Sequence, residues 1–323
     1  MRLTLDQIKA ITVGALRVWE EDEVFRFAKC TQKQENAWFA LDEVLGSRSM
    51  ATTGVRLDFY TNSKFIAFTP QIKSACGRYE IYVDNIFKYY YGQSDFAECK
   101  RKEIGLDGNE HRITLYLPAH EIGSLECVEI EDGATVVPPE FERKILFIGD
   151  SITQGWDSTY DSLSYAQQVS RFLNAESIIQ GIGGGFFHNT VFDEAIEFDP
   201  DIVVVAFGTN DWMYYKTVEE GKMQCSQFLE QIQNKYGDKK VFGISPIWRG
   251  DKEKTQAMGE FEECATYVKE EIRNHHMTLV EGEKLVPHLR EFFLGDIIHP
   301  NTSGFGIYAL NLIDVLTDDC ILA

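Results

Sequence analysis

Apolar residues follow two different patterns in the two halves of this 323-residue chain. In the second half, five continuous apolar runs occur, at residues 144–148, 176–180, 201–207, 240–245 and 277–282. Segments with the spacing of helices alternate with them, at residues 164–174, 222–236, 261–274 and 304–316. Continuous apolar strands that alternate with helices are typical of a parallel sheet covered on both faces. The pattern therefore predicts an α/β domain over residues 141–323.

The first half has the pattern of antiparallel strands. Short segments rich in β-branched and aromatic residues lie at residues 55–61, 64–70, 77–92, 111–118 and 125–138. Gly, Asn, Asp or Pro separates them, which predicts an antiparallel β-sandwich with a hairpin turn at Asp84-Asn85. The pattern changes after Pro138-Pro139. We therefore expect an N-terminal β-sandwich domain at residues 1–140 and the α/β domain at residues 141–323.

Composition limits the partners. The net charge is -20, which argues against nucleic acid and anionic membrane surfaces, because phosphate binding depends on Lys and Arg. The seven cysteines are scattered and form no CxxC pair, so we expect neither a disulfide framework nor a zinc site. The N-terminal residues do not have the pattern of a signal peptide, so we expect none here, and we find no apolar stretch of membrane-spanning length. We expect a cytoplasmic protein without metal or cofactor, and its oligomeric state stays open.

Glycine-rich and polar blocks follow the predicted strands. In open parallel α/β sheets, ligands bind at the carboxyl ends of the strands. The blocks are, in chain order, "GDS" at 149–151, "GIGGGFFHN" at 181–189, "GTNDW" at 208–212, "PIWRG" at 246–250 and "GDIIHPN" at 295–301. One pocket at this edge of the sheet can collect residues from all five blocks.

Acyl transfer needs the residue types that these blocks supply. Ser151 is a hydroxyl that becomes a nucleophile when a base takes its proton. His299 is the natural base, because imidazole titrates near neutral pH, and Asp296 stands three residues earlier, where it can hold one ring nitrogen. An oxyanion needs preorganised donors. The Ser151 N–H, a glycine N–H of the "GIGGG" segment and the Asn210 side-chain amide are candidates.

Taken singly, each of these residues is better explained as a turn, a helix cap or a surface loop. Gly, Asp and Ser are the usual turn formers. The argument rests on their conjunction, because they follow successive predicted strands in the order that one mechanism requires. Asp150 is expected to shape the turn before Ser151 and to take no part in the chemistry.

Together, "GDSITQG", the glycine-rich second block, "GTND" and "DxxHP" resemble the SGNH (GDSL-type) hydrolase family over roughly residues 143–320. The resemblance implies a flavodoxin-like α/β/α domain with Ser151 as nucleophile, His299 as base and Asp296 as the acid that orients it. It also implies an oxyanion hole made by Ser151, Gly184 and Asn210.

The resemblance leaves the choice of oxyanion glycine open, and the sequence differs from the family motif at one position. Gly183 is the alternative to Gly184 as the oxyanion glycine, because the register of the second block is not fixed by the sequence. Ile152 stands where the motif that names the family has Leu, and this is a conservative change.

The layout of a β-sandwich before such a domain resembles the family-2 carbohydrate esterases, which implies a jelly-roll-like first domain and an acetyl esterase activity. The layout is also similar to that of a few acyltransferases with the same two-domain build. Aromatic side chains flank the blocks, and more than half of them are expected to be packing residues. Trp212, Trp248 and Arg249 are the candidate substrate contacts.

Several functions are therefore compared. The first is a serine esterase that hydrolyses small acyl esters, above all acetyl esters, of an acetylated oligosaccharide or a similar substrate. An acyltransferase would share the acyl-Ser151 intermediate and differ only in the acceptor. A metallophosphoesterase needs several His and Asp ligands, and only His299 falls in a suitable block. A non-catalytic carbohydrate-binding protein is disfavoured by the intact set of candidate residues.

Overall fold

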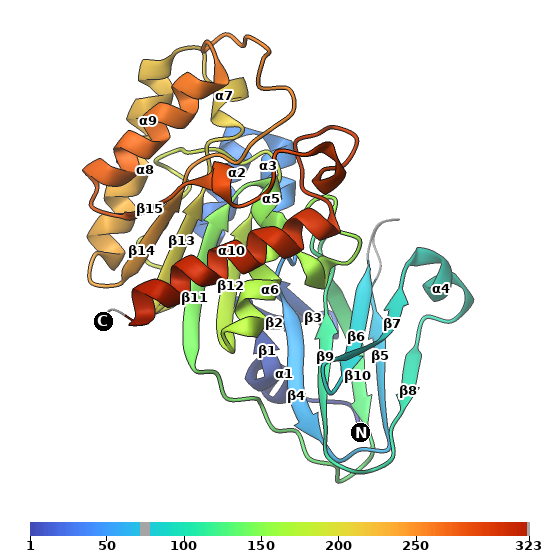
Figure 1. Ribbon diagram of the computed structural model, residues 1–323. Helices are drawn as coiled ribbons and strands as arrows, with labels where there is room; N and C mark the ends of the chain where they lie inside the picture. The colour runs from blue at the N-terminus through green and yellow to red at the C-terminus, as the bar shows by residue number, and fades with distance from the viewer. Residues whose placement is uncertain (72–77, 322–323) are drawn as a thin grey trace. The chain divides into compact units, whose positions relative to one another are not determined.

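The computed structural model describes residues 1–71 and 78–321, and the side chains of 318–321 are left out (Figure 1). The chain divides into two compact units. Unit 1 consists of Met1–Thr31 and Met50–Phe141, and unit 2 of Gln32–Ser49 together with the chain from Glu142 onward. The expected division had one boundary, near Glu140. The structure has a boundary close to this position and also assigns Gln32–Ser49 to unit 2.

Unit 1 contains two antiparallel sheets, each of five strands over the described residues. The first has the order β1-β4-β9-β6-β7, with strands Thr12–Val13, Arg56–Thr61, His111–Tyr116, Tyr79–Val83 and Ile86–Tyr91. The second has the order β2-β3-β10-β5-β8, with strands Arg17–Glu21, Val24–Ala28, Ser124–Ile130, Phe65–Pro70 and Lys102–Gly105. Both sheets contribute to one apolar core, which includes Phe27, Phe59, Phe68 and Leu115. The predicted antiparallel β-sandwich is thereby confirmed.

The hairpin in unit 1 follows its turn sequence. Asp84 and Asn85 have φ angles of 55° and 62° and connect β6 to β7, with Val83 opposite Ile86. Two consecutive residues with positive φ make the turn that suits strand twist, and Asp and Asn tolerate this conformation. The sequence patterns did not predict β1, β2, β3 or β8, nor helices α1 (Leu5–Ile11) and α4 (Gln93–Glu98). Residues 72–77, which include Cys76 and the start of the predicted segment 77–92, lie outside the described residues.

Unit 2 is built on a parallel sheet with the order β12-β11-β13-β14-β15. The strands are Ala175–Gly181, Arg143–Gly149, Ile202–Ala206, Lys240–Ile244 and Thr278–Val280. Numbered along the chain, this is the order 2-1-3-4-5 of flavodoxin-like folds. All five predicted apolar runs form strands. The predicted flavodoxin-like sheet is confirmed.

Helices cover both faces of this sheet (Figure 1). Helices α6 (Tyr165–Phe172) and α10 (Thr302–Ile321) share an apolar cluster with Ile145, Phe147 and Val204 of the strands. On the other face, Ile272 of α9 (Phe261–Asn274) packs against Gly243, and α9 lies beside α8 (Val218–Tyr236). Across the described residues, no helix combines the length and the apolar character needed to cross a membrane.

Two helices that precede most of unit 1 in sequence pack in unit 2. They are α2 (Gln32–Leu41) and α3 (Glu43–Ser49), and Asp42 begins α3 by accepting hydrogen bonds from the N–H groups of Val44 and Leu45. The side-chain amides of Gln34 and Gln180 exchange two hydrogen bonds, of 3.0 and 2.9 Å. The Trp38 ring meets Phe186 edge to face, with centroids 6.1 Å apart. The sequence patterns predicted no element here.

Candidate active site

Ser151 is the first residue of α5 (Ser151–Gln154), directly after the sharp turn that follows β11 (Arg143–Gly149). Asp150 caps α5, because its Oδ1 accepts the Ile152 N–H at 2.9 Å. Gly155 ends the helix in the left-handed region, with φ at 90°. Gly149 lies so close to Thr153 and to the Ala206 carbonyl that a Cβ would clash with both. The local sequence therefore fixes the turn and places the Ser151 hydroxyl at the carboxyl end of the sheet.

The structure brings together the three residues predicted for nucleophile, base and acid. The Ser151 Oγ lies 2.7 Å from Nε2 of His299, and Nδ1 of the same ring lies 2.6 Å from Oδ2 of Asp296. The other carboxylate oxygen, Oδ1, accepts the N–H groups of Ile298 and His299 at 2.9 and 3.2 Å. Although burial acts to raise it, these hydrogen bonds hold the pKa of Asp296 below its ordinary value. An ionised Asp296 can hold a proton on Nδ1 and leave Nε2 free to accept one from Ser151.

A second carboxylate, which the sequence analysis missed, faces the same ring nitrogen. The Oδ2 of Asp157 lies 3.6 Å from Nδ1 of His299, and Asp157 has a positive φ of 72°. Within the described chain, Asp157, Asp296 and His299 are the cluster whose candidate metal-ligand atoms lie within 4.8 Å of one another. The two imidazole nitrogens already contact Asp296 and Ser151.

The second block forms a loop, residues 181–187, which we call the glycine loop. Side chains from separate segments hold its backbone. Two loop N–H groups donate to side chains: that of Gly183 to Gln154 Oε1 at 2.7 Å and that of Phe187 to Asp211 Oδ1 at 3.3 Å. Three side chains donate to loop carbonyls: Arg48 to Gly183 at 2.8 Å, Asn210 to Gly185 at 2.8 Å and the Tyr215 hydroxyl to Phe187 at 2.5 Å. The loop is therefore held rigidly by tertiary contacts.

The hydrogen bonds distinguish the two candidate oxyanion glycines. The Gly183 N–H is taken by Gln154, whereas the Gly184 N–H has no acceptor among the described residues. Gly184 also has a φ of 81°, in the left-handed region that favours glycine. The Ser151 N–H lies in the first turn of α5, where amides have no intrahelical acceptor. Gly184, Ser151 and the second hydrogen of the Asn210 amide are therefore the donors available to an oxyanion.

Two buried acids adjoin these donors. Burial raises the pKa of Asp150 to about 6, against the opposing effects of the Ile152 N–H and of the His299 and Arg249 charges. Burial also raises the pKa of Asp211 well above its ordinary value, although the Phe187 N–H acts to lower it. Asp150 caps the nucleophile turn and Asp211 holds the glycine loop, so both support the backbone of the site.

The structure corrects two of the three predicted substrate contacts. Trp212 is fully buried and donates its indole N–H to the Gly259 carbonyl. Arg249 is 1% exposed, donates to the Thr209 carbonyl and pairs with Asp251. Its guanidinium also lies 4.9 Å from the Trp212 ring centroid. Both side chains are buried and already bonded to protein groups, so neither is exposed to make the predicted substrate contact. Trp248 is partly buried and stacks on His288.

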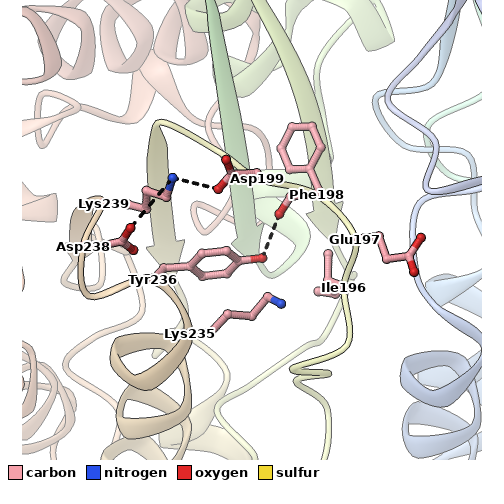
Figure 2. Close-up of a pocket in the computed structure, with 8 residues that line it drawn as sticks. All are labelled: Ile196, Glu197, Phe198, Asp199, Lys235, Tyr236, Asp238 and Lys239. Carbon is pink, nitrogen blue, oxygen red and sulfur yellow. Dashed lines mark hydrogen bonds and ion pairs between the residues drawn. The ribbon is translucent and has the colours of Figure 1, made fainter.

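A hollow of about 470 Å³ lies away from these residues (Figure 2). Its lining comes from the segments just before β13 and β14, at the amino ends of the strands. Lys239 pairs with Asp199 at 2.7 Å, and the Tyr236 hydroxyl donates to the Phe198 carbonyl. Polar groups that are already paired with one another offer little to a ligand, so the chemistry is placed at the carboxyl ends.

The fold and this geometry define unit 2 as a flavodoxin-like α/β/α domain of the SGNH type, with a serine at the end of its first strand. Residues 147–307 match the model of the GDSL-like lipase/acylhydrolase family. This part of the chain is therefore similar in sequence to that family.

Solved structures share the fold. The salicylyl-acyltransferase SsfX3 from a tetracycline biosynthetic pathway is 17% identical with a TM-score of 0.76, over 93% of this chain and 92% of that one. A family two carbohydrate esterase from Cellvibrio japonicus is 14% identical with a TM-score of 0.64, over 98% and 97%. Another, from Clostridium thermocellum in complex with cellohexaose, is 18% identical with a TM-score of 0.64, over 83% and 93%. No curated protein sequence matches the chain.

Proposed function

We propose that this protein is a serine esterase that removes small acyl groups, above all acetyl, from carbohydrates. The observation that carries the proposal is a pair of hydrogen bonds, one between Ser151 Oγ and His299 Nε2 at 2.7 Å and one between His299 Nδ1 and Asp296 Oδ2 at 2.6 Å. Hydrogen bonds of this length join a nucleophile to its base and the base to a group that orients it.

In the proposed reaction, His299 takes the hydroxyl proton as Ser151 Oγ attacks the ester carbonyl carbon. The carbonyl oxygen becomes an oxyanion, which accepts hydrogen bonds from the Ser151 and Gly184 N–H groups and from the Asn210 amide. The tetrahedral intermediate collapses, the C–O bond to the sugar breaks and His299 returns the proton to the leaving hydroxyl. Water then attacks the acyl-serine with His299 again as base, which releases the acid and restores Ser151.

The substrate class is supported by the structural relatives. Two of those compared are described as family two carbohydrate esterases, and one is described in complex with cellohexaose. An acetylated oligosaccharide is the corresponding substrate for this chain. The strong negative charge of the protein suits a neutral substrate of this kind better than a polyanion.

A second candidate is acyl transfer to an alcohol in place of water. It is favoured by the similarity to the acyltransferase SsfX3, whose TM-score of 0.76 exceeds the 0.64 of the two esterases. The acyl-Ser151 intermediate is common to both reactions. The acceptor alone distinguishes them, so a test must supply both water and alcohols.

The test is acetate release from acetylated xylo- and manno-oligosaccharides by the wild type and by Ser151→Ala. We expect release by the wild type only. In parallel, a p-nitrophenyl phosphonate should label Ser151, as mass spectrometry of the modified peptide would show. Added alcohols that divert the acyl group from water would favour the transferase. Full activity of Ser151→Ala would contradict the mechanism, and absence of phosphonate labelling would contradict the nucleophile assignment.

A further inference from the structure

Arg48, at the end of α3, contacts the glycine loop. Its Nη1 donates to the Gly183 carbonyl at 2.8 Å, and its guanidinium carbon lies 5.6 Å from the centroid of the Trp156 ring. Arg48 belongs to Gln32–Ser49, the segment that packs in unit 2 although most of its sequence neighbours form unit 1. A charged side chain from a distant segment therefore contacts the loop that carries the oxyanion glycine.

The fit around the two glycines is tight. A Cβ at Gly184 would lie 3.1 Å from Nη1 of Arg48 and 3.3 Å from the Leu45 side chain. A Cβ at Gly183 would lie 2.7 Å from the Trp156 indole nitrogen. Arg48 and Leu45 of α3 therefore lie against the backbone of the loop at Gly184, and a larger residue there would force them to shift.

We propose that Arg48 is a positioning residue for acyl transfer, which aims the Gly184 N–H at the oxyanion. This inference rests on the proposed function. The Gly183 carbonyl and the Gly184 N–H belong to one peptide group, which is planar and trans, so the two bonds point in opposite directions. A donor that fixes the carbonyl oxygen therefore fixes the direction of the N–H.

The charge of Arg48 adds to this effect. A charged donor makes a stronger hydrogen bond than a neutral one. A hydrogen bond to a peptide carbonyl also polarises the peptide and strengthens its N–H as a donor. Arg48 thus both aims the Gly184 N–H and improves it, without touching the substrate. Gln154 accepts the Gly183 N–H and Asn210 donates to the Gly185 carbonyl, so side chains hold the backbone on both sides of the peptide group that Arg48 contacts.

The test compares Arg48→Ala, Arg48→Lys and Lys33→Met in the full chain. Lys33 lies on α2, in the same segment, and pairs with Asp193 at 3.3 Å, so its variant controls for loss of one positive charge there. We expect Arg48→Ala to lower kcat about 10-fold with KM changed less than twofold, since a misdirected donor costs less than the 10²–10³-fold loss of a whole donor. Arg48→Lys should recover part of kcat, because an ammonium can still donate to the Gly183 carbonyl.

Phosphonate labelling separates this inference from the proposed function. The phosphonyl oxygen occupies the oxyanion position, so Arg48→Ala should label about 10-fold more slowly than the wild type while keeping its melting temperature. If the wild type labels and Arg48→Ala labels equally fast, the inference is overturned and the function stands. A rise in KM at unchanged kcat would also overturn it, as would an equal loss in Lys33→Met. If the wild type does not label, the proposed function fails.

Discussion

The nucleophile turn and the glycine loop follow neighbouring parallel strands, β11 and β12, but they are held in different ways. The turn around Ser151 is fixed by its own sequence, because Asp150 caps α5 and Gly155 ends it. The glycine loop is held by side chains from elsewhere, among them Arg48 and Asn210. One half of the site is therefore encoded locally, and the other half depends on tertiary contacts. The two halves should respond differently to substitution.

The largest effect should come from the base. We expect His299→Ala to lower kcat on the order of 10⁴-fold or more, because Ser151 then has no group to take its proton. The measurement is kcat for a chromogenic acetyl ester, with the melting temperature as a check on folding. Exogenous imidazole should restore part of the rate. His188→Ala, which removes another histidine of unit 2, is the control, and a similar loss there would contradict a specific role for His299.

The next effect should come from the glycine-loop side. Asn210→Ala removes one oxyanion donor, and such losses lower kcat about 10²–10³-fold. Because Asn210 also holds the Gly185 carbonyl, the variant should in addition lose part of its thermal stability, which His299→Ala should not. Equal melting temperatures of the two variants would contradict the view that the glycine loop, unlike the nucleophile turn, is held by tertiary contacts.

This contrast also explains what the sequence predicted. The parallel sheet, Ser151, His299 and Asp296 were predictable, because each lies in a short block after a strand or before α10. The hydrogen bond from the Gly183 N–H to Gln154, which favours Gly184 over Gly183 as the oxyanion glycine, was not predictable from the sequence. The contact of Arg48 with the loop could not be predicted from the sequence. Its helix is separated from the loop by more than 130 residues, and no local pattern indicates such a contact.

The wrong predictions have a related cause. Trp212 and Arg249 follow strands of the sheet, as the site residues do, and position alone suggested substrate contact. Their side chains turn inward, where the indole N–H and the guanidinium find protein partners. A buried polar group needs such partners, and sequence spacing does not show which side of a turn supplies them.

A smaller loss of kcat should distinguish the roles of Asp296 and Asp157, the two carboxylates that face His299. Asp296→Asn should lower kcat about 10- to 100-fold, less than the 10⁴-fold typical of a triad whose only acid is changed, because Asp157 stands 3.6 Å from the same nitrogen. Asp157→Asn alone should lower kcat about threefold or less, since the closer acid remains. The double variant should lose more than the product of the two. Equal kcat for Asp296→Asn and the double variant would exclude a role for Asp157.

The smallest effect is on stability, and it concerns the local turn. Burial raises the pKa of Asp150 from 3.8 to about 6, so between these values the folded protein binds more protons than the unfolded chain. Stability should therefore fall as pH rises through this window. The amide that Asp150→Asn introduces has no proton to lose, and an asparagine can still cap a helix. The unfolding free energy of Asp150→Asn, relative to wild type, should thus increase from pH 4 to pH 7.

The measurement is denaturant unfolding of the wild type and Asp150→Asn at both pH values. A shift of about two pKa units corresponds to at most about 3 kcal/mol, so a relative gain of about 1–3 kcal/mol is expected. Asp314→Asn, which removes an exposed carboxyl of α10, controls for the loss of one negative charge. If the difference between Asp150→Asn and wild type is the same at both pH values, the carboxyl is not held protonated by burial. The nucleophile turn would then depend on its surroundings as much as the glycine loop does, because other groups would have to stabilise a buried charge beside Ser151.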